Sequence, residues 1–486
     1  MFRFESRIIS ISDSFPSYLR LVKRLVFFVF VLFFSSHFFG QEVKNITFLD
    51  RWFQDSLPSN SSQVRFSGCW GFTKNGKEYA VVGSTYGTHV FLITNENKFQ
   101  PIGSVKGRYS SAQVVTREAK VFGNYLYATC DEGPSSLQII DLQFLPDSIV
   151  LVNDLRNETF GRIHNLFVDE ENALLYLCSV TPVLNNLELP MRPLCVFSLA
   201  NPLEPQLLWT GPSDIPEVHD IFVRDNIAFL NCGFNGLRVY DFSNPTQPIY
   251  LNNLQFYSEQ GYNHQGWLSP DGKTYVFGDE TAGTRLKKVN VGANYELQVG
   301  QLFGRPNIPN PKTAHNLQIT NDFAFVAYYN DGLRIYDLRT PVPQEIAAYD
   351  TYIDNELTNN FSMWGAWGIY ALFPSERIIV SDRNNGLFLF HFDRNSFSVS
   401  SSNTFQLFPN PVSENEKITI RTVNDEITDF SVEIFDLTGK LLLQETITES
   451  SFWSGSFAVS GMYFLRLTYV NYLNEEISEL KKFVVK

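Results

Sequence analysis

Hydrophobic and polar residues alternate along most of the chain with the two-residue period of β-strands. No long segment after the N-terminus keeps the 3.6-residue apolar period of a helix. Phe and Tyr, which favour strands, are abundant, with 44 Phe and 22 Tyr among 486 residues. The pattern therefore predicts an all-β protein. At this length the chain should hold more than one domain, unless a repeated unit enlarges one of them.

The middle of the chain repeats one strand–turn–strand unit. Segments 117–130, 219–232 and 315–328 align without a gap, and each has apolar residues at alternate positions around a polar turn. A further strand follows a glycine turn at 236–241 and again at 332–337. Seven units can be traced. They begin near Cys69, Arg117, His164, His219, His264, His315 and Trp367.

The length of the repeat predicts how the units are assembled. Successive units from His164 to His315 begin at intervals of 45 to 55 residues. Four short strands per unit, repeated seven times, predict a seven-bladed β-propeller. The ring has to close, because a single four-stranded unit cannot bury both of its faces. A β-helix or an open solenoid is the alternative, although either would need shorter coils of constant length.

The N-terminus has the pattern of an export signal. Lys23 and Arg24 precede an apolar run from Leu25 to Phe34, and small and polar residues follow up to Gln41. Ten apolar residues are too few to span a bilayer, which needs about 20. We therefore predict a signal peptide within residues 1–41. The stretch before Lys23 is long for a bacterial signal, so the true start could lie after residue 1. An uncleaved membrane anchor is the alternative.

Residues 405–486 have a pattern of their own and follow a Ser-rich linker at 394–404. Alternating strands with Thr-Gly turns predict a small C-terminal β-sandwich. Its ordered elements are Phe408–Val412, Ile418–Ile420, Val432–Lys440, Gly461–Leu467 and the basic last strand Lys481–Lys486.

This ordered set resembles the C-terminal sorting domain of the type IX secretion system. The resemblance implies that residues 405–486 are recognised by the type IX secretion machinery. It also implies that the protein leaves a diderm bacterium, to be secreted or attached to the outer surface. An accessory sandwich that aids binding is the alternative.

The repeats carry a second resemblance, which covers roughly residues 44–393. The strings 237–245 and 333–341 resemble the LVIVD repeat. The ordered motifs Gly68–Phe72, Ile163–Asn165, Val218–Asp220 and Asn263–Trp267 resemble the choice-of-anchor B family of surface proteins. Members of that family carry one of several surface-attachment tails. No enzymatic activity comes with the resemblance.

Four of the seven histidines open the first strand of a repeat. In a propeller the first strand is innermost, so these residues should meet at the rim of the central channel. Neutral imidazoles beside carboxylates suit a transition metal. The alternative is structural, with each histidine bonded within its own blade. The residues predicted at the rim are His164, His219, His264 and His315, the metal candidates, together with Arg117, Glu118 and Asp220.

Acidic residues follow the second strands of three repeats and are predicted to form a collar around the same opening. Their carboxylates could bind Ca²⁺ through oxygen ligands. Hairpin turns also favour Asp for backbone reasons alone, which is the alternative. The collar consists of Asp131, Glu132, Asp279, Glu280 and Asp382.

Composition excludes several classes of function. The net charge of −13, without a basic stripe, argues against nucleic-acid binding. Five cysteines are few and odd in number, so we expect small buried residues rather than a disulfide scaffold. The sequence lacks the common hydrolase, zinc-protease and nucleotide-binding motifs. We therefore predict a secreted or surface-attached propeller that binds a partner through its channel face. The alternatives are a metal-dependent enzyme using the histidine cluster and a structural surface component.

Overall fold

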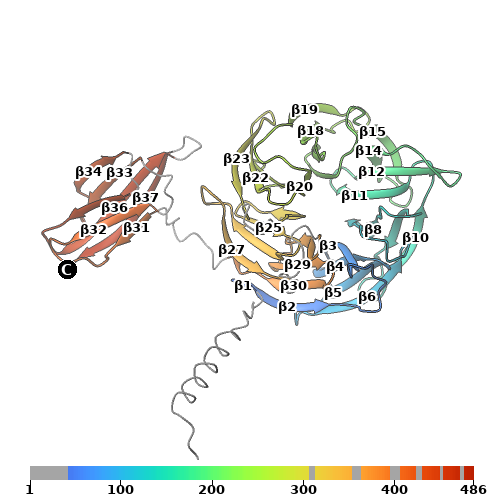
Figure 1. Ribbon diagram of the computed structural model, residues 1–486, viewed down its shortest axis with the longest axis horizontal. Coiled ribbons are helices and arrows are strands. Elements are labelled where there is room, and N and C mark those ends of the chain that lie inside the picture. The colour runs from blue at the N-terminus through green and yellow to red at the C-terminus, as the bar shows by residue number, and fades with distance from the viewer. Residues whose placement is uncertain are drawn as a thin grey trace, which may run out of the picture. The chain divides into compact units, whose positions relative to one another are not determined.

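The computed structural model describes residues 42–305, 312–352, 363–394, 405–422, 429–448, 452–470 and 476–486 (Figure 1). The predicted signal peptide and nearly all of the predicted linker lie outside these residues. Every regular element in the described part of the chain is a β-strand, which confirms the all-β class. Among these residues no helix is long and apolar enough to cross a membrane.

Residues 43–394, as far as they are described, form seven antiparallel sheets. Figure 1 shows these sheets arranged around a common centre, with the first strand of each repeat innermost. The inner strands of consecutive sheets contact each other, and the last inner strand contacts the first. The inner strands are β3 (Phe66–Lys74), β7 (Ala119–Phe122), β11 (Gly161–Asp169), β16 (Asp220–Arg224), β20 (Asn263–Leu268), β24 (Leu317–Ile319) and β28 (Ala366–Tyr370).

The second strand of each sheet is almost wholly buried, because it has a neighbouring strand on both sides and a neighbouring sheet on both faces. The second strands are β4 (Lys77–Ser84), β8 (Tyr125–Ala128), β12 (Leu174–Leu184), β17 (Ile227–Asn231), β21 (Thr274–Asp279), β25 (Phe323–Ala327) and β29 (Arg377–Asp382).

The third strands follow tight turns. Gly236 and Gly332 in two of these turns have φ of 77° and 74°, the left-handed conformation that the sequence predicts there. The third strands are β5 (Gly87–Ile93), β9 (Leu137–Asp141), β14 (Arg192–Ser198), β18 (Leu237–Asp241), β22 (Leu286–Val291), β26 (Leu333–Asp337) and β30 (Gly386–His391).

The outer strand of the last sheet comes from the beginning of the described chain. β2 (Thr47–Trp52) pairs with β30, so residues from both ends of the repeat region share one sheet. Two short strands, β1 (Val43–Lys44) and β13 (Leu187–Glu188), extend β27 and β12. The other outer strands are β6 (Phe99–Lys106), β10 (Val150–Leu155), β15 (Gln206–Gly211), β19 (Ile249–Leu254), β23 (Leu297–Phe303) and β27 (Gln344–Tyr349).

Apolar clusters lie between neighbouring sheets, so each sheet buries its faces only against the next. The cluster between the last and the first sheet combines Ile379 and Leu389 with Phe66 and Val82. All five cysteines are free and buried within such clusters or beside them. Four-stranded sheets packed face to face around a centre make this part of the chain a β-propeller.

The C-terminal part, described by itself, consists of two antiparallel sheets. One apolar cluster draws residues from both, including Ile418 and Ile420 from one sheet and Val432 and Leu465 from the other. The three-stranded sheet has the order β31 (Phe405–Phe408), β32 (Lys417–Thr422), β35 (Phe452–Ser456), and the four-stranded sheet has the order β34 (Leu441–Ile447), β33 (Phe430–Phe435), β36 (Gly461–Val470), β37 (Glu476–Val485).

Candidate functional site at the channel mouth

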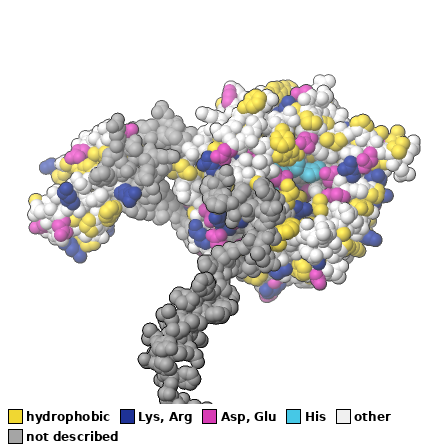
Figure 2. All heavy atoms as spheres, in the orientation of Figure 1, with side chains coloured by type: hydrophobic (Ala, Val, Ile, Leu, Met, Phe, Trp, Pro, Cys, Tyr) yellow, Lys and Arg dark blue, Asp and Glu magenta, His cyan; other side chains and the backbone are white. Residues whose placement is uncertain are grey.

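Four histidines lie near the starts of neighbouring inner strands, and their tilted rings form one row. The ring centroids of His164 and His219, of His219 and His264, and of His264 and His315 are each 4.2 Å apart. The Trp367 ring continues the row 3.8 Å from His315. We call these five side chains the channel mouth. Figure 2 shows a small patch of histidine on one face of the propeller, with acidic side chains beside it.

Each of three histidines uses its Nδ1 to bond an oxygen outside its own sheet. Nδ1 of His219 donates to the carbonyl of His264 at 3.0 Å, and Nδ1 of His315 donates to that of Trp367 at 2.8 Å. Nδ1 of His164 donates to Oδ2 of Asp131 at 2.9 Å. A carbonyl only accepts, so a neutral ring with this bond has a lone pair on Nε2. The structural alternative expected bonds within one blade, whereas these bonds join neighbouring sheets.

His164 and His219 face each other through their remaining nitrogens, with 2.7 Å between the two Nε2 atoms. Burial lowers the pKa of His164, but the hydrogen bond and charge of Asp131 outweigh it, so this pKa is raised. Burial, together with the charges of His164 and His264, lowers the pKa of His219 well below its usual range. A protonated His164 beside a neutral His219 satisfies both nitrogens.

Glu280 reaches the same row from the end of β21. Its Oε2 lies 3.7 Å from Nε2 of His264, and its Oε1 accepts a hydrogen bond from the Tyr329 hydroxyl. His219, His264 and Glu280 offer ligand atoms that all lie within 4.8 Å of one another. Sequence analysis expected four histidine ligands and placed Glu280 in a separate collar; the structure instead groups Glu280 with two of the histidines.

The five residues of the predicted collar do not come together. Asp279 is buried and accepts a bond from Lys287 Nζ at 2.7 Å, and Asp382 accepts backbone N–H bonds within its own turn. Glu132 accepts the backbone N–H of Thr116. Only Asp131 and Glu280 contact the channel mouth among the collar residues. Successive strand residues point to opposite sides, so Asp279 and Glu280 diverge.

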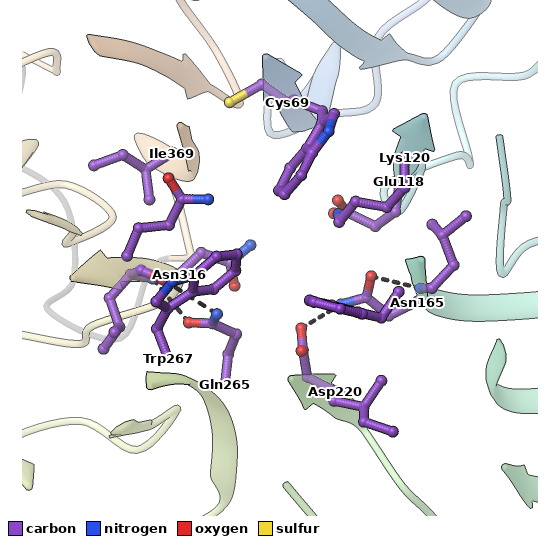
Figure 3. Close-up of a pocket in the computed structure, with 15 residues that line it drawn as sticks. Cys69, Glu118, Lys120, Asn165, Asp220, Gln265, Trp267, Asn316 and Ile369 are labelled. Carbon is purple, nitrogen blue, oxygen red and sulfur yellow. Dashed lines mark hydrogen bonds between the residues drawn. The ribbon is translucent and has the colours of Figure 1, made fainter. Parts of the chain in front are cut away.

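Beneath the channel mouth, polar side chains line a small cavity of about 30 Å³ (Figure 3). This volume is large enough for water but far too small for an organic ligand. Asn165 donates to Asp220, and Trp367 Nε1 donates to Glu118 at 3.3 Å. We call the polar residues of this cavity the inner layer. They are Glu118, Lys120, Asn165, Asp220, Gln265, Asn316 and Gln318.

Burial dominates the electrostatics of the inner layer. It raises the pKa of Asp220 to about 7, although the Lys120 charge opposes the shift and the Glu118 charge adds to it. Burial also raises the pKa of Glu118, against the effects of Lys120 and Trp367. Glu118 and Asp220 were predicted at the rim of the channel, but they line the cavity beneath the channel mouth. Arg117 turns away and donates to the carbonyls of Ser84 and Tyr109.

Comparison with known families confirms two of the resemblances, to the LVIVD repeat and to the sorting domain. Residues 217–255 and 311–351 match the LVIVD repeat, and residues 406–486 match the secretion system C-terminal sorting domain. The protein carries LVIVD repeats and a type IX secretion sorting domain. It is therefore a secreted or surface-attached β-propeller, and its C-terminal domain interacts with the secretion machinery. No curated protein matches the chain.

Several solved structures resemble the chain at low identity. The extracellular domain of BT3049 of B. thetaiotaomicron, named as a hybrid two-component system, is 12% identical, with a TM-score of 0.47 over 91% of this chain and 57% of that one. This chain thus spans little more than half of that domain. The RRP9 WD40 repeats are 12% identical, with a TM-score of 0.48 over 73% of this chain and 100% of theirs. The β-propeller domain of Myceliophteria thermophila Cps50 (Swd1) is 10% identical, with a TM-score of 0.46 over 67% and 99%.

Two tyrosines contact the histidines although the sequence pattern does not single them out. Tyr329 stacks edge-on against His315 at 5.1 Å, and Tyr262 does the same against His219 at 5.3 Å. Tyr329 follows the second strand β25, and Glu280 follows the second strand β21. This similar position in the repeat is the sequence signal that could have placed Tyr329 beside the histidines. Tyr262 lies in the connection that leads into β20 and has no counterpart in the repeat alignment.

Proposed function

We propose that the protein is a seven-bladed β-propeller, displayed outside the cell, that binds a partner through the face that carries the channel mouth. Seven sheets, and the contact between the last and first inner strands, support the blade number. A C-terminal β-sandwich is supported by the two sheets that share one apolar cluster. Membership of the choice-of-anchor B family agrees with the LVIVD repeats and the separate tail.

The distribution of exposed apolar side chains carries the proposal. We call the side on which the inner strands begin and the second strands end the histidine face. Outside the outer strands and β1, the described propeller has eight exposed large hydrophobic residues, and only Phe144 lies on the opposite face. Exposed apolar groups gathered on one face are typical of interaction sites. Those on the histidine face are Phe53, Leu184, Leu187, Met191, Phe234, Phe256 and Met363.

Phe234 links this apolar surface to the channel mouth. It is 74% exposed, and its ring lies 5.2 Å from Tyr262, which in turn contacts His219. An aromatic side chain held open beside polar groups is the kind of residue that dominates binding energy in interfaces. The position predicts that Phe234 contributes to binding without contributing much to stability.

The test compares Phe234→Ala with Phe144→Ala in the full chain. The wild-type protein is screened on peptide and glycan arrays, and the affinity of any bound component is then measured for both variants. We expect Phe234→Ala to weaken binding by about tenfold or more, and Phe144→Ala, a matched exposed Phe on the other face, to leave it unchanged. Equal effects would contradict binding through the histidine face. Failure to bind any component would favour the structural surface role.

A further inference from the structure

We propose that His219, His264 and Glu280 form a binding site for a divalent transition-metal ion at the channel mouth. This inference rests on the proposed function, because it names one ligand of the same face. Two imidazoles and one carboxylate are a donor set found at catalytic zinc sites, whereas Ca²⁺ takes oxygen ligands. The three side chains come from two neighbouring sheets, so the bound ion would also join those sheets.

The spacing of the three groups fits one ion. Their ligand atoms lie within 4.8 Å of one another, and Nε2 of His264 is 3.7 Å from Oε2 of Glu280. Zinc–nitrogen and zinc–oxygen bonds of about 2.0–2.2 Å place tetrahedral ligand atoms roughly 3.4 Å apart. Side-chain shifts of about 1 Å or less would therefore bring all three atoms into coordination distance.

Hydrogen bonds already orient two of the ligands. Nδ1 of His219 donates to the carbonyl of His264, so the lone pair of this ring is on Nε2, where a metal would replace the 2.7 Å contact with Nε2 of His164. The Tyr329 hydroxyl donates to Oε1 of Glu280 and leaves Oε2 facing His264. Such outer contacts are a regular feature of metal sites, where they fix the tautomer and the angle of each ligand.

His264 supplies an independent sign of a missing partner. The residue is 2% exposed, and its Nδ1 has no hydrogen bond of ordinary geometry within the described residues. Its Nε2 faces Glu280 at 3.7 Å, which is too long for a hydrogen bond. A buried imidazole without a well-formed hydrogen bond on either nitrogen is unfavourable. A metal ion on Nε2 removes that penalty for one of the two nitrogens.

Zinc binding to tag-free, chelator-treated full-length protein tests the inference. We expect one Zn²⁺ per chain by calorimetry and elemental analysis, and a tetrahedral absorption spectrum with Co²⁺. Glu280→Gln and His264→Ala should weaken zinc binding by about 100-fold or more, and Tyr329→Phe by about 10- to 100-fold. Glu132→Gln and His391→Ala are the matched controls and should bind as the wild type does.

Thermal melting of Glu280→Gln checks that the variant is folded. Zinc binding that is absent, or that survives both Glu280→Gln and His264→Ala, would overturn the inference. Phe234→Ala should leave zinc binding intact. Loss of zinc binding would therefore not affect the proposal of partner binding, and loss of partner binding would not affect the proposed metal site. Three protein ligands leave a coordination position for water or a partner group. The alternative function, a metal-dependent enzyme, would need that open position.

Discussion

The channel mouth and the inner layer lie next to each other on the same strands, yet they differ in what their side chains can do. His219 bonds the neighbouring strand through Nδ1, and its Nε2 faces His164, while Nε2 of His264 faces Glu280. Asp220 and Gln265, the next residues along the chain, bond other groups of the protein around a small cavity. Alternation along a strand thus gives one repeat both a ligand-binding surface and a polar contact between sheets.

The same contrast recurs in two adjacent residues at the end of β21, Asp279 and Glu280. Asp279 and its partner Lys287 are completely buried, with 2.7 Å between the carboxylate and the ammonium. Glu280 instead lies at the channel mouth beside His264. Interior charges should therefore affect stability strongly, whereas charges at the mouth should affect binding and proton affinity. Three measurements test this division between interior and surface charges.

Lys287→Met should have the largest effect. It leaves the Asp279 carboxylate buried without its ammonium partner, and loss of one member of a buried pair costs about 3–5 kcal/mol. Arg285→Met is the matched control, because Arg285 lies two residues away and pairs with Glu259 at the surface. That variant should lose less than about 1 kcal/mol. Urea unfolding measures both, and equal losses would contradict the division between interior and surface charges.

Asp220→Asn should change how stability depends on pH. Burial raises the pKa of Asp220 from 3.8 to about 7, so the folded state holds this proton more tightly than the unfolded state. The resulting stabilisation is complete below pH 3.8 and is lost as the pH rises through 7. Between pH 5 and pH 8 the wild type should therefore lose about 2–3 kcal/mol more than the variant.

Urea unfolding at the two pH values measures this difference. Asp225→Asn is the control, since its carboxylate is 78% exposed, and it should follow the wild type. In Asp220→Asn the new side chain keeps an amide oxygen that can still accept the hydrogen bond from Asn165, so folding should be retained. An Asp220→Asn profile as steep as that of the wild type would mean that other inner-layer groups carry the pH dependence.

Much of the fold, and the row of histidines, could be predicted from the sequence. Gap-free repeats place His164, His219, His264 and His315 at equivalent positions, and closure of a ring brings equivalent positions together. The alternation of apolar residues is enough to predict the strands. These features depend on periodicity, which a sequence displays directly.

Side-chain direction at the strand ends could not be predicted in the same way. The pairing of β20 with β21 shifts register between Asn263 and Gln265, so His264 has no partner residue on β21, and a sequence pattern does not reveal such an irregularity. Arg117 was expected at the rim, but its long side chain reaches carbonyls of other segments. A repeat alignment shows which residue types recur, but it does not show which neighbouring sheet each one bonds.

Asp131→Asn should have the smallest effect on stability, and it tests the electrostatics of the channel mouth alone. The hydrogen bond and charge of Asp131 counteract burial and raise the pKa of His164, so the neutral amide should lower that pKa. A histidine with a raised pKa stabilises the folded state below its unfolded pKa, and this contribution disappears as the pH rises through the folded value. The loss at low pH should stay below about 1 kcal/mol, because His164 is partly exposed.

Imidazole NMR titration of His164 measures the shift directly. Glu188→Gln is the matched control, because Glu188 pairs with Arg162 rather than with His164, and it should leave the titration unchanged. A His164 pKa that stays raised in Asp131→Asn would assign the proton to the charges of Glu118 and Asp220 beneath it. In that case the inner layer would set the protonation of the mouth, and the two layers would be one electrostatic unit.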